Sequence, residues 1–194
     1  MVYAKTEQAH AVLAKQFKEK TNHRQYLALL DGYMKEPSAL LESYLYRDPK
    51  QRLRFASMSL QTYAHSFPDP TLAPKHHKWA KSAFRKLKTF ADRYTLVSVT
   101  LFTGRTHQIR VHSKELGLPI VGDPLYNEHY KHKTISKVFS KEVTAALEGL
   151  NRQMLHAQSL GFTHPVSGES LFFQAEPPAD FKNILTLLQS YEDH

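Results

Sequence analysis

The sequence YTLVSVTLFTGRTHQIRVHSKELG, residues 94–117, changes its hydrophobic period halfway along. Residues 94–102 alternate apolar side chains with small polar ones, which is the pattern of a strand with one buried face. A turn at residues 103–106 follows, and a short helix is expected over residues 107–116. Gly117 is placed to end this helix as a C-terminal cap. The segment therefore predicts a strand, a turn and a helix in succession.

The surrounding sequence predicts a sheet with helices around it. Residues 80–90 also read as a strand, and Ala91-Asp92-Arg93 joins them to residues 94–102 in a hairpin. Further strands are expected at residues 2–5, 25–30, 42–46, 54–60, 155–162 and 170–174. Helices are expected at residues 6–20, 140–150 and 179–191, and a turn is expected at residues 66–70. Mixed elements with hairpin connections predict the α+β class, with a mixed, largely antiparallel sheet and flanking helices.

The length and composition fit one domain. The chain has 194 residues, of which 41% are hydrophobic and 11% aromatic, and this is enough to build a packed core. We find no internal repeat, low-complexity tract or domain linker, so residues 1–194 are expected to form a single domain. No apolar run approaches the length of a membrane span, and the first residues lack a signal-peptide pattern. A soluble cytoplasmic protein is therefore expected.

The charge is strongly positive, with 26 Lys and Arg against 18 Asp and Glu, a formal net charge of +8. Such a bias attracts polyanions, nucleic acid above all, although charge alone fits a merely soluble basic protein equally well. A basic run with interleaved Trp79 and Phe84 comprises Lys75, Lys78, Lys81, Arg85, Lys86 and Lys88. This run could follow an RNA backbone or simply solvate a strand face, and we favour RNA.

Several kinds of chemistry are disfavoured by residue type. The sequence has no cysteine, which excludes disulfides, thiolate nucleophiles and cysteine-ligated metals. The pair His76 and His77 and the pair His129 and His132 lack carboxylate or cysteine partners at zinc-site spacing, so no metal site is expected. A hydrolase with His107 or His112 as base is a poor reading, because no serine or threonine lies in a recognisable nucleophile elbow.

Two adjoining strings carry a specific resemblance. Thr103-Gly104-Arg105-Thr106-His107-Gln108-Ile109-Arg110-Val111-His112, followed by Pro119-Ile120-Val121-Gly122-Asp123-Pro124-Leu125-Tyr126, closely resembles a signature of the RluA-type RNA pseudouridine synthases. Three further segments occur in the family's order: Val2 to Thr6, Arg24 to Ala28, and Leu155 to Ala157 leading to His164-Pro165 and Gly168. The resemblance extends from residue 1 to about residue 181 and is poor over residues 45–79.

The resemblance implies an activity and a partner. Members of the family flip a uridine out of structured RNA, break its glycosidic bond, rotate the base and rejoin it through C5, without cofactor or metal. The expected partner is therefore rRNA or tRNA. By motif position, Tyr26 corresponds to the tyrosine that packs against the target base and is a candidate to handle the C5 proton. Arg110 corresponds to the arginine that pairs with the catalytic aspartate. We expect Tyr26 and Arg110 to face a common cleft.

Other basic residues are predicted to contact RNA. Arg105 and His107 lie with Arg110 beside the start of a predicted helix, a place that suits phosphates, and we assign Arg105 and His107 to RNA binding or loop positioning. Lys81, Arg85 and Lys88 of the basic run are also assigned to RNA binding. Asp123 and Tyr126 are expected to shape their loop, whereas catalysis is not their expected role.

The family's aspartate has no counterpart in residues 1–194. In the family it stands in a His-Arg-Leu-Asp segment shortly before the strand that corresponds to Val2, and this chain contains no such segment. An internal start, a deliberate fragment and a natural non-catalytic relative are all possible, and we favour truncation before Met1. A non-catalytic RNA-binding remnant is the alternative function. Missing initial strands would leave a sheet edge uncovered, so self-association is also expected.

Overall fold

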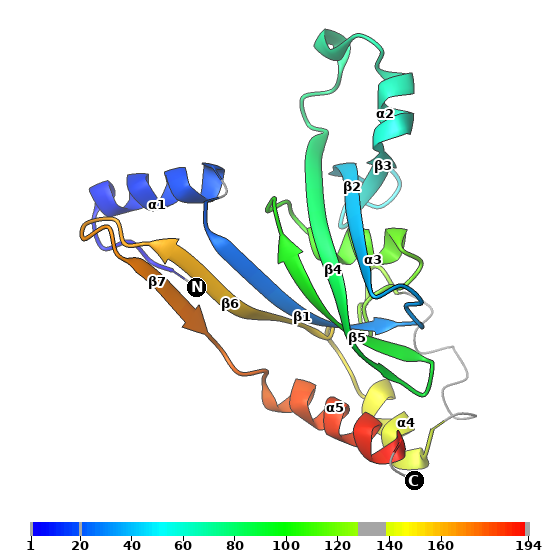
Figure 1. Ribbon diagram of the computed structural model, residues 1–194. Helices are drawn as coiled ribbons and strands as arrows, with labels where there is room; N and C mark the ends of the chain where they lie inside the picture. Colours follow the sequence, from blue (N-terminus) through cyan, green and yellow to red (C-terminus); the bar gives the residue numbers. More distant parts are fainter. Residues whose placement is uncertain (1, 20, 128–138, 193–194) are drawn as a thin grey trace.

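The computed structural model describes residues 2–19, 21–127 and 139–192 (Figure 1). Its centre is a seven-stranded sheet in the order β3-β2-β4-β5-β1-β6-β7, in which each described pair of neighbours is antiparallel. The strands are β1 (His23–Asp31), β2 (Ser38–Arg47), β3 (Phe55–Ser59), β4 (Lys78–Phe90), β5 (Tyr94–Leu101), β6 (Leu155–Thr163) and β7 (Ser170–Gln174). The predicted α+β class with a largely antiparallel sheet is confirmed.

Within the described residues, five α-helices and one 3-10 turn accompany this sheet. They are α1 (Glu7–Glu19), α2 (Leu60–Ser66), the 3-10 turn η1 (Pro70–Leu72), α3 (Gln108–Glu115), α4 (Lys141–Glu148) and α5 (Ala179–Glu192). Figure 1 shows α1 near the β6 and β7 side of the sheet and α4 beside α5 at the other end. The chain between β3 and β4, with α2 and η1, extends beyond the end of β4.

The hydrophobic core is centred on β1. Its apolar run supplies Ala28, Leu29 and Leu30, which are fully buried, because this strand has neighbours on both sides and packing on both faces. Helix α5 contributes Phe181 and Leu188 to the same cluster. The loop after α3 joins the backbone of β1, since Val121 donates its N–H to the carbonyl of Leu29 at 2.9 Å. This loop therefore has a fixed position beside the central strand.

The strand register assigns side chains to the two faces of the sheet. Tyr26 lies opposite Val99, and Val99 lies opposite Phe84, so these three side chains share one face. Ser82, two residues before Phe84, points to this face too, and its hydroxyl binds Gln108 and His112 of α3. We call this side of the sheet the α3 face. Tyr26 and α3 are therefore on the same face.

One local expectation was wrong. Residues 2–5 are not a strand, because no described strand pairs with them and an extended segment without a partner makes no ladder hydrogen bonds. The strand expected over residues 54–60 is present as β3, and α2, which the sequence did not predict, follows it from Leu60. The Ser59 side chain accepts the N–H of Thr62 at 3.1 Å and so caps this helix. Serine at this position was a readable signal for a helix start.

Candidate active site

A cavity of about 690 Å³ lies on the α3 face beside Tyr26. This volume is within the range of small-molecule sites. The cavity is bounded by α1, β1, β6 and β7, and its lining residues are Val2, Phe17, Arg24, Tyr26, Ala157, Gln158, Ser159, Leu160, Phe162, Phe173, Gln174 and Ala175. Tyr26 is half-buried, and its hydroxyl makes no hydrogen bond within the described residues. The ring and the hydroxyl of Tyr26 are therefore both available to a ligand.

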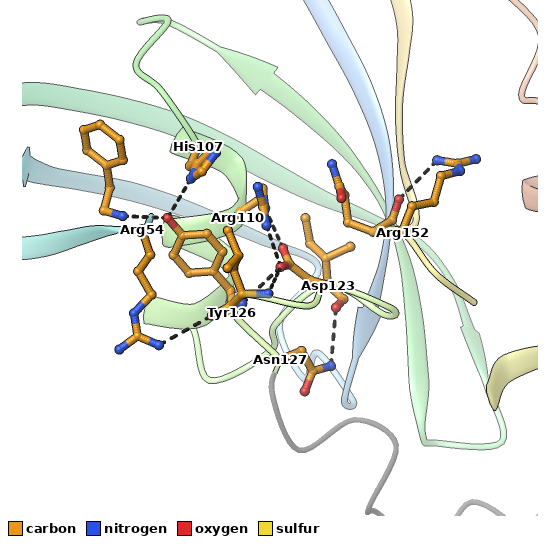
Figure 2. Close-up of polar contacts among 11 residues, drawn as sticks. Arg54, His107, Arg110, Asp123, Tyr126, Asn127 and Arg152 are labelled. Atoms are coloured by element: carbon orange, nitrogen blue, oxygen red, sulfur yellow. Dashed lines mark hydrogen bonds and ion pairs between the residues drawn. The ribbon is translucent and has the colours of Figure 1, made fainter. Parts of the chain in front are cut away.

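Arg110 forms a buried, bidentate ion pair with Asp123. Its Nε donates to Asp123 Oδ2 and its Nη2 to Asp123 Oδ1, both at 2.7 Å (Figure 2). The two side chains are 10% and 0% exposed, so water screens the pair little. The sequence did not predict this carboxylate partner for Arg110. The cause is the loop at residues 119–127, whose contacts with β1 bring Asp123 to α3.

Both carboxylate oxygens of Asp123 are occupied by hydrogen bonds within the protein. Besides Arg110, its Oδ1 accepts the backbone N–H of Leu125 at 2.9 Å and of Tyr126 at 3.0 Å. This carboxylate thus accepts four hydrogen bonds, with two of them closing its own loop. Such a group orients its neighbours, because its side chain is 0% exposed and both of its oxygens are held by hydrogen bonds. The arrangement agrees with the expected loop-shaping role of Asp123.

Tyr126 and His107 continue this network toward β3. The Tyr126 hydroxyl accepts the N–H of Phe55 at 2.8 Å and contacts His107 Nδ1 at 2.9 Å (Figure 2). Because the oxygen already accepts from Phe55, donation of its proton to Nδ1 is favoured, which leaves His107 protonated at Nε2. The Arg110 guanidinium lies over the Tyr126 ring, 4.8 Å from its centroid. Burial raises the pKa of Tyr126 above its ordinary value.

His107 has an unusual backbone conformation at the start of α3. Its φ of 56° and ψ of 16° are in the left-handed region, which favours glycine. Burial lowers the pKa of His107, and the charge of Arg110 adds to this effect. Its ring is therefore neutral at pH 7. A non-glycine residue held in this conformation is typical of functional segments, because only strong surrounding contacts maintain it.

Gln108 holds the turn that precedes α3. Its side-chain oxygen accepts from the Thr103 hydroxyl at 2.7 Å and from the Arg105 N–H at 3.0 Å, and its nitrogen donates to Ser82 at 2.8 Å. Arg105 is tied to the sheet in addition, because its Nε donates to the Trp79 carbonyl at 3.0 Å. The turn at residues 103–106 is thus held by hydrogen bonds within the signature string and is fixed to β4. Sequence reasoning missed Gln108, although an amide within a polar turn was a readable signal.

His112 joins α3 to two strands. Its Nε2 lies 3.1 Å from the Ser43 hydroxyl of β2 and its Nδ1 lies 2.9 Å from the Ser82 hydroxyl of β4. All three residues are 0% exposed, so a substrate has no access to them. This burial is a stronger reason against His112 as the base of a hydrolase than the missing elbow. Burial also lowers the pKa of His112 from its ordinary 6.5 to about 4.

The shifted pKa of His112 predicts a loss of stability in mild acid. Unfolded chains bind a proton at this ring below about pH 6.5, whereas the folded chain does so only near pH 4. The free energy of unfolding should therefore fall by up to about 3 kcal/mol between pH 6.5 and pH 4. Urea unfolding at several pH values measures this change. The variant His112→Gln should show a flatter dependence in this range, and an unchanged slope would contradict the assignment.

The structure brings some of the predicted site residues together and separates others. Arg105, His107 and Arg110 form one group around the start of α3, on the same sheet face as Tyr26, although no direct contact joins Tyr26 to Arg110. Lys81 and Arg85 alternate with Ser82 and Phe84 along β4, so they point to the opposite face. Lys81 binds Glu42 there at 2.7 Å. Lys88 donates to Gln189 of α5. RNA binding by these three residues stays a prediction.

The sequence predicted neither a metal site nor a membrane span. The described residues contain no group of three His, Cys, Asp or Glu side chains that could hold a metal ion. His76 and His77 pack against each other edge to face, whereas His129 and His132 lie outside the described residues. None of the helices over the described ranges is long and apolar enough to cross a bilayer.

Comparisons with known proteins identify the family of this chain. A family model described as RNA pseudouridylate synthase matches residues 1–115. RNA pseudouridine synthase 2, chloroplastic, of Arabidopsis thaliana is 35% identical over 97% of this chain and 43% of its own length. Ribosomal large subunit pseudouridine synthase D of Xanthomonas campestris is 36% identical over 97% of this chain and 51% of its own length. The chain belongs to the RNA pseudouridylate synthase family and resembles its RluA-type members.

A solved structure shows the same fold. Human RNA Pseudouridylate Synthase Domain Containing 1 superposes with a TM-score of 0.64 at 22% identity, over 98% of this chain and 74% of that one. The chain spans about half the length of the sequence relatives described above. The family model and the sequence relatives confirm the predicted family.

Proposed function

We propose that this chain supplies most of the active site of an enzyme that isomerises uridine to pseudouridine in RNA. The observation that carries the proposal is the position of the signature string. This string forms the turn and helix that hold Arg110, on the sheet face that also carries Tyr26 and its cavity. A base displaced from RNA needs an aromatic surface and a concave site, and Tyr26 offers both.

The reaction assigns a task to each group. The N1–C1′ bond breaks, the base rotates, C5 bonds to C1′, the C5 proton leaves and N1 takes up a proton. The Tyr26 ring stacks on the base, and its oxygen takes the C5 proton while its own hydroxyl proton passes to N1, so that the phenol is restored. Arg110 holds the family's catalytic carboxylate through the guanidinium edge that Asp123 leaves open. His107 and Arg105 contact the RNA around the flipped nucleotide.

The carboxylate itself comes from outside residues 1–194. Asp123 is buried and accepts four hydrogen bonds, and the sequence has no His-Arg-Leu-Asp segment. The 194-residue chain alone is therefore expected to form no pseudouridine, whereas the same chain extended upstream through such a segment is active. The alternative, a non-catalytic RNA-binding remnant, is favoured by one observation: Arg110 is already satisfied by Asp123.

Mapping of the product distinguishes these two functions. Both forms are incubated with total rRNA and tRNA from a synthase-deficient strain, and pseudouridine is located by carbodiimide adducts that stop reverse transcription. The extended chain with its upstream aspartate changed to asparagine is the control. Product from the extended chain alone is the expected result. An inactive extended chain that still binds RNA would favour the remnant, and product from the short chain would overturn the need for an upstream carboxylate.

The target and the location are further proposals. We favour rRNA over tRNA, because the Xanthomonas campestris relative is named as a large-subunit ribosomal enzyme. A cytoplasmic location stays a prediction, since the Arabidopsis thaliana relative is described as chloroplastic. Self-association also stays a prediction. Its support is the edge strand β7, where Phe172 and Phe173 are 59% and 53% exposed.

A further inference from the structure

Arg24 is a charged side chain, and no ion pair joins it to a carboxylate of the residues that the structure describes. It lies on β1 two residues before Tyr26, so both side chains point to the α3 face, and both line the same cavity. The lining residues include no Asp or Glu among those that the structure describes. The Nε of Arg24 is buried without a hydrogen-bond partner over the same described ranges. A buried donor without a partner is costly, and in native proteins it usually indicates a ligand or a bound water.

The signature turn makes room for this guanidinium. A side chain at Gly104 would place its Cβ 2.3 Å from Arg24 Nη1, which is far inside van der Waals contact. The guanidinium end of Arg24 thus occupies the space that the missing side chain of Gly104 leaves open. The turn and the cavity are thus coupled through one contact between Gly104 and Arg24.

We infer that Arg24 binds a phosphodiester of the RNA strand, at the nucleotide whose base stacks on Tyr26. Side chains two residues apart on one strand face are separated by about 7 Å, a distance that a single nucleotide spans between its base and its phosphate. Guanidinium suits this task, because its planar set of donors matches two phosphate oxygens at once. Phe17, Phe162 and Phe173 line the cavity with apolar surface, which lowers the local polarity around this contact.

The inference rests on the proposed function for its ligand, and it names a contact that the function does not require. A carboxylate from another segment of the protein is the other oxyanion that could meet Arg24. The two sources differ in one measurable property. Binding of a phosphate releases counterions from RNA and so contributes to the salt dependence of RNA affinity, whereas an internal carboxylate contributes nothing to it.

Filter binding of an rRNA stem-loop across a salt series tests the site. Affinity of the wild-type chain should fall linearly with salt on logarithmic axes. Arg24→Gln should bind about tenfold more weakly at physiological salt. The slope of its log affinity against log salt concentration should be smaller in magnitude by about one. Arg24→Lys keeps the charge and should keep the slope. The control Lys182→Gln removes an equal charge on α5, where the side chain is 52% exposed, and should leave the slope unchanged.

A second variant keeps the test valid if Arg24→Gln unfolds. Gly104→Ala displaces only the flexible end of Arg24, so it should fold, keep its charge and still bind RNA more weakly. A wild-type slope and affinity in both Arg24→Gln and Gly104→Ala would overturn the inference and indicate the carboxylate. If the RNA affinity of the wild-type chain does not depend on salt concentration, that result would instead count against RNA as the partner, and so against the proposed function itself.

Discussion

Replacing Tyr26 by phenylalanine is expected to slow pseudouridine formation by the upstream-extended chain about 10²- to 10⁴-fold, which is the usual contribution of a positioned acid–base group. The phenyl ring keeps the stacking surface, so RNA affinity should change little. Only the hydroxyl is lost, and in the structure this hydroxyl has no hydrogen bond within the described residues. Single-turnover conversion of an rRNA substrate measures the rate, and filter binding measures the affinity.

A matched control separates chemistry from general damage. Tyr33 is 44% exposed and outside the cavity, so Tyr33→Phe removes the same atom at a site with no assigned role. We expect it to retain full activity. Tyr26→Ala removes the ring as well, and it should lose both rate and affinity. A Tyr26→Phe enzyme with wild-type turnover would show that another group takes the C5 proton.

The variant Asp123→Asn is expected to destabilise the chain by about 3–5 kcal/mol, because it leaves the Arg110 charge buried without a counter-charge. The amide retains an acceptor for the N–H groups of Leu125 and Tyr126, so the loss reports chiefly on the ion pair. Urea unfolding of the 194-residue chain gives the free energy. In the extended enzyme, the same change should also lower activity, since α3 then holds Arg110 less firmly.

The exposed pair Arg152–Asp180 is the control for this variant. It has the same bidentate geometry, with both contacts at 2.7 Å, but its side chains are 36% and 46% exposed. Asp180→Asn should therefore cost less than about 1 kcal/mol. Equal losses in Asp123→Asn and Asp180→Asn would mean that burial of Arg110 does not matter, and the structural role given to Asp123 would be wrong.

The spacing of hydrophobic residues predicted helices and strands well in segments where a single periodicity dominates. The hairpin of β4 and β5 and the helix α3 lie within two residues of their expected bounds, because the strands alternate apolar and polar residues and a glycine ends the helix. Helix α2 was missed, since its seven residues carry too little periodicity to outweigh the turn signals after it. The segment at residues 2–5 reads as a strand, but a strand exists only where a neighbour pairs with it.

The site was predictable only in part, because partners depend on tertiary contacts. The motif identified Arg110, yet its pairing with Asp123 depends on a loop that docks against β1. Alternation along β4 places the side chains of Lys81 and Ser82 on opposite faces of the sheet. Only the contacts of Ser82 with α3 reveal which face the helix covers. Arg24 carried no signal of its own. Its importance comes from a buried nitrogen and a neighbouring glycine, which are properties of the folded chain.

Release of tritium from RNA labelled at C5 of uridine tests the proposed chemistry most directly, because formation of each C5–C1′ bond expels one C5 hydrogen. The upstream-extended chain should release tritium in step with pseudouridine, and Tyr26→Phe should bind the same RNA with release slowed at least about 10²-fold. Release at the wild-type rate from Tyr26→Phe, or no release from an extended chain that binds RNA, would contradict an isomerase site built around Tyr26.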